Sequence, residues 1–371
     1  MTDSGALSGY PKGVARTVGV EEELLLVDAR SGEPRAVADA VLDGGPWPRE
    51  LVAELQQQQL ELNSSPCVTL DQLREELRSW RRRAADLARP EGVAVAALGT
   101  SPVTVPPRLT PRGRYRRMAQ SFGLTAQETL TCGCHVHVGV ESDEEGVAVV
   151  DRIRPWLPPL LALSSNSPLW QDTDTGYASY RYQVFGRWPT AGPTRGFGSA
   201  EGYRAAVSRL LATGILIDQG MLYFDARLSA KFPTVEVRVC DVCPEYQDSV
   251  VLAALVRGLV ETAAREWADG HPAPDDDLAL LRLASWRASR SGLDGALLDP
   301  RTFRPASAHD VVETLVAHVE DALKDAGDLY TVRAGIDRLT SRGSGARRQR
   351  EMYARGGAPA VLRDAVRRTA A

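Results

Sequence analysis

The sequence predicts an α+β fold in which several strands turn polar side chains toward one shared face. Polar and apolar residues alternate, as they do in half-buried strands, over residues 17–27, 131–139 and 234–240. Beyond residue 250 the apolar residues recur at helical spacing instead, with breaks at residues 270–274, 291–305 and 341–346. No internal repeat and no clear domain boundary is visible. We therefore expect a leader over residues 1–13 and one domain over residues 14–371, with an arginine-rich helical region over about 250–371.

The first polar strand is followed by a glutamine-rich segment that ends in Asn-Ser-Ser-Pro. If this segment is a strand, Gln57, Gln59 and Glu61 share one face, whereas a helix would bring Glu54 and Glu61 to the same face. In either case Glu61 lies near the end of the element, because the sequence that follows it favours a turn and a helix cap.

Weaker patterns predict the remaining elements. Thr69 or Asp71 caps a helix through residue 88, whose arginines, Arg78 and Arg81 to Arg83, are expected to face solvent. An apolar run predicts a buried strand at residues 93–98. Prolines should divide the apolar helix of residues 146–165 in two. Further helices are expected at residues 115–121 and 203–213, and a further strand at residues 222–225.

Composition excludes several classes of protein. The chain has 371 residues, 43% hydrophobic and 25% charged, which is ordinary for a globular protein. Its formal charge of −4 creates no general attraction for nucleic acid, so anions must be bound by local arginines. There is no apolar run of membrane-spanning length and no signal-peptide pattern at the N-terminus. We therefore expect a cytoplasmic protein that binds neither nucleic acid nor membrane.

Three of the predicted strands carry their polar residues in the same register. His135 and His137 are two of only five histidines, and alternation places both imidazoles on one strand face. Glu21 and Glu23 repeat this arrangement in the first strand. The strand of residues 234–240 repeats it again, with Glu236 and Arg238.

The residue types on this face indicate hard-cation and phosphate chemistry. Adjacent carboxylates repel one another unless a cation or an arginine lies between them. Ligation dominated by oxygen favours Mg²⁺ or Mn²⁺ over zinc, and more than one cation is expected for four carboxylates. Arginines beside such a site are suited to phosphoryl transfer. No P-loop and no Gly-x-Gly-x-x-Gly sequence opens a helix, which argues against the common kinase and Rossmann nucleotide sites.

The five cysteines offer an alternative, a zinc or redox site, because Cys132 and Cys134 precede the histidines and Cys240 and Cys243 form a CxxC. In a strand, however, Cys132 and Cys134 point away from the imidazoles. Neither pair has the spacing of a zinc finger. Buried structural thiols are the favoured interpretation.

Two arginine-rich segments remain open to two interpretations. Residues 166–197 are a long segment of little periodicity that contains several aromatics, and its Arg181, Arg187 and Arg195 could reach a common anion or lie in solvent. The basic residues beyond residue 342 could likewise be solvated or close over a nucleotide.

Taken together, six motifs resemble the carboxylate-amine ligase family, often labelled glutamate–cysteine ligase type 2. The resemblance extends from about residue 14 to the segment 341–350 and rests on residues 19–23 (GVEEE), 61–65 (ELNSS), 131–139 (TCGCHVHVG), 174–181 (DTGYASYR), 185–190 (FGRWPT) and 233–243 (PTVEVRVCDVC). Two positions depart from the family pattern, Glu22 and Cys134, where relatives commonly have an apolar residue and a methionine.

The resemblance implies a glutamine-synthetase-like fold, in which a curved, mostly antiparallel sheet holds metal ions and ATP on its concave face and helices pack on its convex side. It implies an enzyme that forms carbon–nitrogen bonds by ATP-dependent ligation. A substrate carboxylate attacks the γ-phosphate of ATP, and an amine then attacks the acyl phosphate. Weak glutamate–cysteine ligation is an activity of the family.

The resemblance also implies roles for individual residues. It implies Mg²⁺ ligation by Glu21, Glu23, Glu61, His137 and Glu236, while His135 would bind either metal or substrate. Arg238 would bind the phosphate or the acyl phosphate. Arg181 and Arg187 would hold anions, and Arg187 would contact the nucleotide with Arg238.

Other functions compatible with the same residues are a guanidino- or amino-phosphotransferase of this fold and a metal- or nucleotide-binding regulator without turnover. The expected partners of the ligase are a small glutamate-like carboxylic acid and an amine. A homodimer is expected from the frequency of such assemblies.

Overall fold

The structure, a computed structural model, describes residues 15–43 and 51–370, so the expected leader lies outside the described residues. A seven-stranded sheet forms its centre, with the order β2-β3-β1-β5-β9-β8 and with β4 also paired to β1. Every described strand pair of this sheet is antiparallel. Its strands are β1 (Val18–Asp28), β2 (Leu51–Ala53), β3 (Gln59–Asn63), β4 (Val93–Ala96), β5 (Gly133–Gly139), β8 (Ala226–Leu228) and β9 (Thr234–Asp241).

Helices surround the sheet and account for nearly all of the C-terminal region, which confirms the predicted α+β class. Two small hairpins add β6 (Leu169–Trp170) with β7 (Thr173–Asp174) and β10 (Ala296–Leu298) with β11 (Pro305–Ser307). The α-helices are α1 (Ala38–Leu42), α2 (Leu70–Ala88), α3 (Gly113–Phe122), α4 (Leu124–Glu128), α5 (Asp143–Ile153), α6 (Leu157–Ser164), α7 (Tyr180–Phe185), α8 (Ala200–Ala212), α9 (Tyr246–Ala268), α10 (Leu278–Ser291), α11 (Ala308–His318), α12 (Glu320–Asp325), α13 (Leu329–Arg342) and α14 (Gly345–Thr369).

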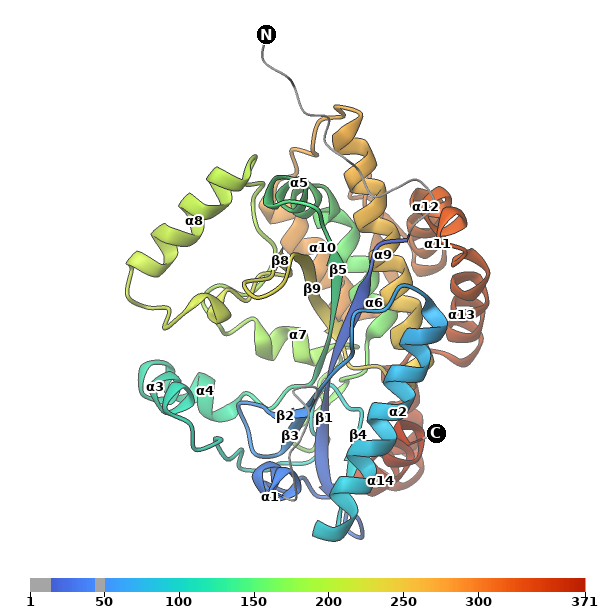
Figure 1. Cartoon of the computed structure of the whole chain (residues 1–371). Helices are drawn as coiled ribbons and strands as arrows, with labels where there is room; N and C mark the ends of the chain where they lie inside the picture. Colours follow the sequence, from blue (N-terminus) through green and yellow to red (C-terminus); the bar gives the residue numbers. More distant parts are fainter. Residues whose placement is uncertain (1–14, 44–50, 371) are drawn as a thin grey trace.

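The two faces of the sheet have different surroundings. Valines of β1, β5 and β9, such as Val20, Val136 and Val237, are buried in one core cluster with residues of α5, α6 and α9. In Figure 1, α2, α9 and α13 stand on the right of the sheet, while α3, α4 and α8 stand on the left. Because side chains alternate along a strand, burial of the valines against helices directs the intervening polar side chains to the other face.

Glu22, the middle residue of the three consecutive glutamates, lies on the helix-covered face. It is fully buried, and Arg81 of α2 donates to both of its carboxylate oxygens at 2.7 Å. Ser249 of α9 donates a third hydrogen bond at 2.5 Å. The expectation that Arg81 faces solvent is therefore wrong. A buried carboxylate needs a cation and hydrogen-bond donors, and Arg81 is the cation that α2 places beside Glu22.

Two other expectations about local structure are corrected. Residues 222–225 form no strand; Leu222 and Phe224 are buried in a separate apolar cluster, and the strand that pairs with β9 begins at Ala226. The segment 166–197 is not a plain loop, since it contains the β6–β7 hairpin and α7. Thr69, by contrast, caps α2 with a capping box, as predicted.

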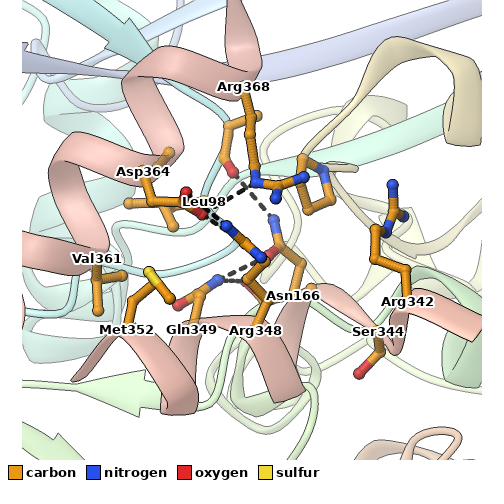
Figure 2. A pocket seen from close by; sticks show the side chains of 14 residues that line it. Leu98, Asn166, Arg342, Ser344, Arg348, Gln349, Met352, Val361, Asp364 and Arg368 are labelled. Atoms are coloured by element: carbon orange, nitrogen blue, oxygen red, sulfur yellow. Dashed lines mark hydrogen bonds and ion pairs between the residues drawn. The ribbon is translucent and has the colours of Figure 1, made fainter. Parts of the chain in front are cut away.

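The arginine-rich C-terminal helix packs on the body of the protein. Figure 2 shows a pocket at which Arg348 and Arg368 contact Asp364, while Gln349 donates to Asn166. Pro244 also lines this pocket and accepts a hydrogen bond from Arg81, so the pocket lies on the Glu22 side of the sheet. These arginines are thus paired within the protein. Among the described residues, no helix has the length and apolar character needed to cross a membrane.

Candidate active site

The polar face of the sheet brings carboxylates and imidazoles from separate strands into direct opposition. Glu21 is the cross-strand partner of His135, and Glu23 is the partner of Glu61. His137 is in turn the partner of Glu236. The predicted convergence of these side chains is therefore seen in the strand register.

Two groups of potential metal ligands result, one at Glu21 and one at Glu23 of β1. Glu21, His135 and Glu236 form the histidine cluster, in which ligand atoms lie within 4.8 Å of one another. Glu23, Glu54 and Glu61 form the carboxylate cluster, which meets the same limit.

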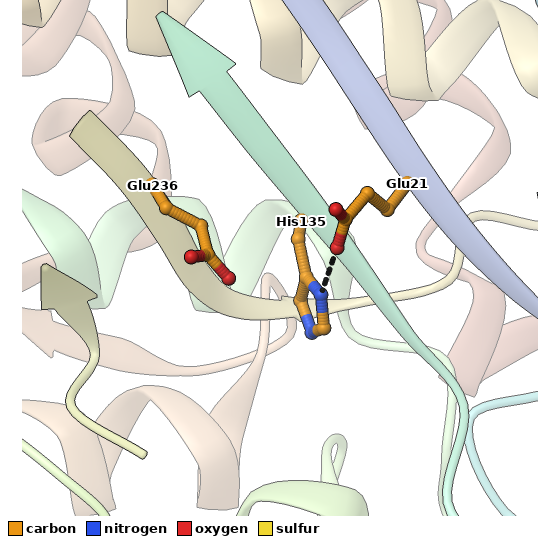
Figure 3. A group of neighbouring side chains, drawn as sticks. All are labelled: Glu21, His135 and Glu236. Atoms are coloured by element: carbon orange, nitrogen blue, oxygen red, sulfur yellow. Dashed lines mark hydrogen bonds and ion pairs between the residues drawn. The ribbon is translucent and has the colours of Figure 1, made fainter. Parts of the chain in front are cut away.

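The histidine cluster is arranged around Glu21, whose carboxylate contacts the imidazoles of His135 and His137. Its Oε2 lies 3.1 Å from Nδ1 of His135, and its Oε1 lies 3.2 Å from Nε2 of His137. Figure 3 shows the imidazole of His135 between the carboxylates of Glu21 and Glu236. Nδ1 of His137 contacts the Thr234 hydroxyl at 3.0 Å, while its buried Nε2 has no hydrogen bond of good geometry among the described residues. That nitrogen therefore faces the Glu21 carboxylate without a well-formed hydrogen bond.

Two arginines donate hydrogen bonds to Glu236, the third residue of the cluster. Arg227 of β8 donates from Nε to Oε2 at 2.8 Å and from Nη2 to Oε1 at 3.1 Å. Arg238 also donates to Oε1. A carboxylate has about four lone-pair sites, so metal ligation by Glu236 stays compatible with these bonds. The sequence pattern did not predict a role for Arg227. It indicated a strand at residues 222–225 and none at residues 226–228, so the side chain of Arg227 was not assigned to the polar face.

The protonation states in the histidine cluster suit a cation. Burial and the positive charge of Arg238 lower the pKa of His135 to about 4, so the ring is neutral near pH 7. Burial opposes ionisation of Glu21, but its contacts with His135 and His137 hold its pKa well below the ordinary value. A neutral imidazole beside an ionised carboxylate is a normal pair of metal ligands.

The three carboxylates of the carboxylate cluster repel one another, so a positive charge among them would be stabilising. Burial and the negative charge of Glu54 raise the pKa of Glu23 to about 7. The pKa of Glu61 is raised well above its ordinary value by the same two causes. Glu23 accepts a hydrogen bond from the Gly133 amide at 2.6 Å, and Glu61 accepts one from Asn63 at 3.0 Å. Three partly buried carboxylates with so few donors fit a divalent cation, whose charge would relieve their repulsion.

Glu54 was not among the predicted ligands. It follows β2 directly, and the pairing of β2 with β3 brings it toward Glu61. The available signal was its position at the start of the glutamine-rich segment, seven residues before Glu61. That spacing was associated with a helix, although a turn between two antiparallel strands also brings the residues together.

Arg238 is the cation that serves both clusters. The pKa of its guanidinium is raised because the charges of Glu236, Glu21 and Glu23 outweigh the effect of burial, and its buried Nε has no hydrogen-bond partner among the described residues. A single guanidinium that interacts with carboxylates of both clusters is well placed to bind an anion between them.

The three loop arginines do not share a partner in the structure. Arg181 is buried, and its guanidinium lies 3.8 Å from the Asp241 carboxylate. The guanidinium also packs so closely against Gly133 that a β-carbon at that position would have no space. Arg187 is partly exposed and pairs with Glu128 at 2.8 Å. Arg195 is exposed. The alternative of a common anion for all three is therefore not supported. Individual anion-binding roles for Arg181 and Arg187 stay predictions.

The cysteines take no part in either cluster. All five are buried and free, as the structural interpretation predicts. Burial raises the pKa of Cys132, Cys134 and Cys243 well above the ordinary value, which disfavours the thiolate that zinc binding and redox chemistry require.

The sequence of this chain is similar to those of a known protein family. The model of a family described as "Glutamate-cysteine ligase family 2 (GCS2)" matches residues 17–370. A protein of Streptomyces avermitilis named "Putative glutamate--cysteine ligase 2-1" is 53% identical over 95% of this chain and 97% of its own length. A Streptomyces coelicolor protein named "Putative glutamate--cysteine ligase 2" is 52% identical over 96% of this chain and 99% of its own length.

Two solved structures share the fold at much lower identity. A glutamate–cysteine ligase of Francisella tularensis in complex with AMP aligns with a TM-score of 0.71 at 14% identity, over 96% of this chain and 88% of its own. A bifunctional glutathione synthetase of Pasteurella multocida aligns with a TM-score of 0.72 at 16% identity, over 96% of this chain and 52% of its own. These similarities confirm the predicted type of sheet fold.

Proposed function

Because the chain belongs to glutamate–cysteine ligase family 2, as its motifs predicted, we propose that it is an ATP-dependent carboxylate-amine ligase that joins glutamate to cysteine. One observation carries the proposal: two clusters of metal-ligand side chains, partly or fully buried, lie on one sheet face, and the charge of Arg238 acts on carboxylates of both. Carboxylates that hold cations, next to a buried guanidinium, are suited to a triphosphate.

The reaction consists of two displacements. The γ-carboxylate of glutamate attacks the γ-phosphorus of ATP, the bond to the ADP oxygen breaks, and an acyl phosphate forms. The amine nitrogen of cysteine then attacks the acyl carbon, phosphate leaves with the electrons of the broken bond, and the nitrogen releases a proton. The products are an amide, ADP and inorganic phosphate.

Residues of the two clusters would divide the binding tasks. Glu23, Glu54 and Glu61 would hold one Mg²⁺ or Mn²⁺, since their oxygens converge and their repulsion requires a cation. Glu21, His135, His137 and Glu236 would hold a second ion or orient the acid substrate. When bound, Mg²⁺ neutralises phosphate oxygens and so makes the γ-phosphorus more electrophilic.

Arginines would bind the negatively charged groups of the nucleotide and of the transferred phosphoryl group. Arg238 would bind the transferred phosphoryl group, because its guanidinium interacts with carboxylates of both clusters and its Nε has a free donor. Arg181 packs against Gly133 and would fix the position of its backbone. The amide of Gly133 in turn orients the carboxylate of Glu23. Arg187 would contact the nucleotide from the partly exposed α7 region.

The proposal is tested by incubating the purified protein with ATP, Mg²⁺, glutamate and cysteine, and by measuring ADP, phosphate and dipeptide separately. We expect equal amounts of the three products and a requirement for every component. Glu23→Gln should abolish turnover, whereas Glu75→Gln on the exposed surface of α2 should leave it unchanged.

Two outcomes would replace the proposal. Phosphate that stays on the acceptor, with no amide formed, would identify a phosphotransferase. ADP formation that is absent with every acid and amine pair, while nucleotide still binds, would identify a regulator without turnover. A screen of acids and amines under the same conditions separates these outcomes from a ligase with different substrates.

A further inference from the structure

The pocket of Figure 2 lies on the helix-covered side of the sheet and contains none of the active-site residues. It is formed where the N-terminal part of α14 meets the segments that follow β4 and β9, and its space of about 380 Å³ includes an opening to solvent. Leu98, Met352 and Val361 give it an apolar wall. An apolar wall with a few polar groups is the usual composition of a small-molecule site.

Gln349 places a buried hydrogen-bond acceptor in this pocket. The residue is 5% exposed, and its Nε2 donates to the backbone oxygen and to Oδ1 of Asn166, each at 2.7 Å. Because both partners are acceptors, the orientation of the Gln349 amide is fixed. Its Oε1 therefore points the other way, toward Met352 and Val361 in Figure 2, and has no hydrogen-bond partner among the described residues. A buried oxygen of this kind is suited to an N–H or O–H group of a ligand.

Three guanidinium groups that line the pocket have donors to spare. Arg342 donates to Glu245 and Asp248. Arg348 and Arg368 each donate two hydrogen bonds to carboxylates as well. A guanidinium has five N–H groups, so each of the three arginines retains N–H groups that these ion pairs do not use. Guanidinium groups with unused donors are suited to a carboxylate or another oxyanion.

The charge around the pocket also favours an anion. The ion pairs form one network, in which three carboxylates are shared among five arginines: Glu245, Asp248 and Asp364 with Arg338, Arg342, Arg348, Arg367 and Arg368. Positive charge is therefore in excess. The first turn of α14 adds the positive end of a helix dipole and contains no acidic residue that would neutralise it.

We propose that this pocket binds a free α-amino acid with a small apolar side chain. The carboxylate of the ligand would accept hydrogen bonds from the guanidinium groups, and its ammonium group would donate to Oε1 of Gln349. Its side chain would lie against the apolar wall. A water molecule would satisfy Oε1 alone, and an inorganic anion would leave the apolar wall uncovered. The proposal does not rest on the ligase activity, because no active-site residue contributes to the pocket.

The first test measures binding of L-alanine and L-valine to the full chain by isothermal titration calorimetry, in the absence of ATP and Mg²⁺. We expect one molecule to bind per chain. Gln349→Leu should raise the dissociation constant at least about 10-fold, because the ammonium group loses its acceptor. Gln120→Leu is the matched control, since Gln120 is exposed on α3. A wild type that binds neither amino acid, as expected for a hydration site only, would overturn the proposal.

The second test uses propionate, which is alanine without the ammonium group. The wild type should bind propionate about 10-fold more weakly than L-alanine, because propionate has no N–H group for Oε1 of Gln349. Gln349→Leu should therefore bind propionate with nearly the wild-type affinity. Equal weakening of both ligands in this variant would show that Oε1 does not receive the ammonium group, and would contradict the proposal.

Arg342→Gln tests the partner of the ligand's carboxylate. Glu245 keeps Arg368 and Asp248 keeps Arg338 as partners, so this change leaves neither carboxylate without a cation. The variant should bind L-alanine and propionate about 10-fold more weakly, with the ratio between the two ligands unchanged. Wild-type affinity for both ligands would contradict an anion site at this position.

A variant of the carboxylate cluster distinguishes this pocket from the active site. Glu23→Gln should bind L-alanine with the wild-type affinity, because Glu23 lies on the other face of the sheet. Binding that is lost in Glu23→Gln but kept in Gln349→Leu would place the amino acid in the active site and overturn the proposal. Failure of the ligase reaction, by contrast, would leave the expected binding unchanged.

Discussion

Arg227 donates hydrogen bonds to both carboxylate oxygens of Glu236 from the neighbouring strand, at 2.8 and 3.1 Å. The two residues are direct cross-strand partners in β8 and β9. The register of one short strand thus determines the orientation of a predicted metal ligand.

Replacement of Arg227 should therefore impair the active site although Arg227 is not a predicted ligand. We expect Arg227→Gln to lower kcat about 10- to 100-fold, in the range seen when groups that orient metal ligands are lost. Arg227→Lys should recover part of the activity, since it restores the charge but not the paired geometry. Arg204→Gln is the control, because Arg204 is 64% exposed and its ion pair with Asp143 is on the surface. Steady-state rates equal to wild type would contradict this role.

Glu54→Gln should separate metal binding from stability. The variant loses one of three mutually repelling carboxylates, so its melting temperature without metal should rise by a few degrees. Its stabilisation by added Mg²⁺ should shrink, because a ligand that binds the native state stabilises it less when its dissociation constant is larger. Melting curves with EDTA and with Mg²⁺ measure both effects. A variant that responds to Mg²⁺ like the wild type would exclude Glu54 from the metal site.

The buried ion pair of Glu22 with Arg81 should be essential as a pair. Arg81→Met leaves a carboxylate buried without its cation, and we expect a loss of about 3–5 kcal/mol in the free energy of unfolding. The double variant Glu22→Gln with Arg81→Met should recover much of this loss. Denaturant unfolding of four proteins, the wild type, both single variants and the double variant, gives the coupling between the two residues. Equal losses for the single and double variants would argue against a specific pair.

His318 should make stability depend on pH. Its ring stacks on Trp156 with centroids 3.9 Å apart, and burial lowers its pKa from 6.5 to about 4. Between these values the unfolded chain binds a proton that the folded chain does not bind, so stability falls as pH decreases from 6.5 to 4. His318→Phe keeps the stacking and removes the titration. The stability of wild type relative to this variant should decline over that range, as measured by unfolding at each pH, and a constant difference would contradict the assignment.

Local alternation determined much of the active site from the sequence. Whether a side chain on β1, β5 or β9 points to the polar face depends only on its position within its own strand. The shared faces of Glu21 with Glu23, of His135 with His137, and of Glu236 with Arg238 could therefore be predicted before the strands were paired. The capped helix after Thr69 was predictable for the same reason, because a cap is a local interaction.

Only the tertiary structure decided which distant residues complete these local patterns. Glu54 and Arg227 reach the site through the neighbours that β3 and β9 acquire, and Arg81 reaches Glu22 through the packing of α2 on the sheet. Each of these contacts joins segments that are separate in the sequence, and the local sequence of one segment does not indicate where the other will lie in the fold. A buried charge requires a partner, but strand order, register and helix packing determine which residue supplies it.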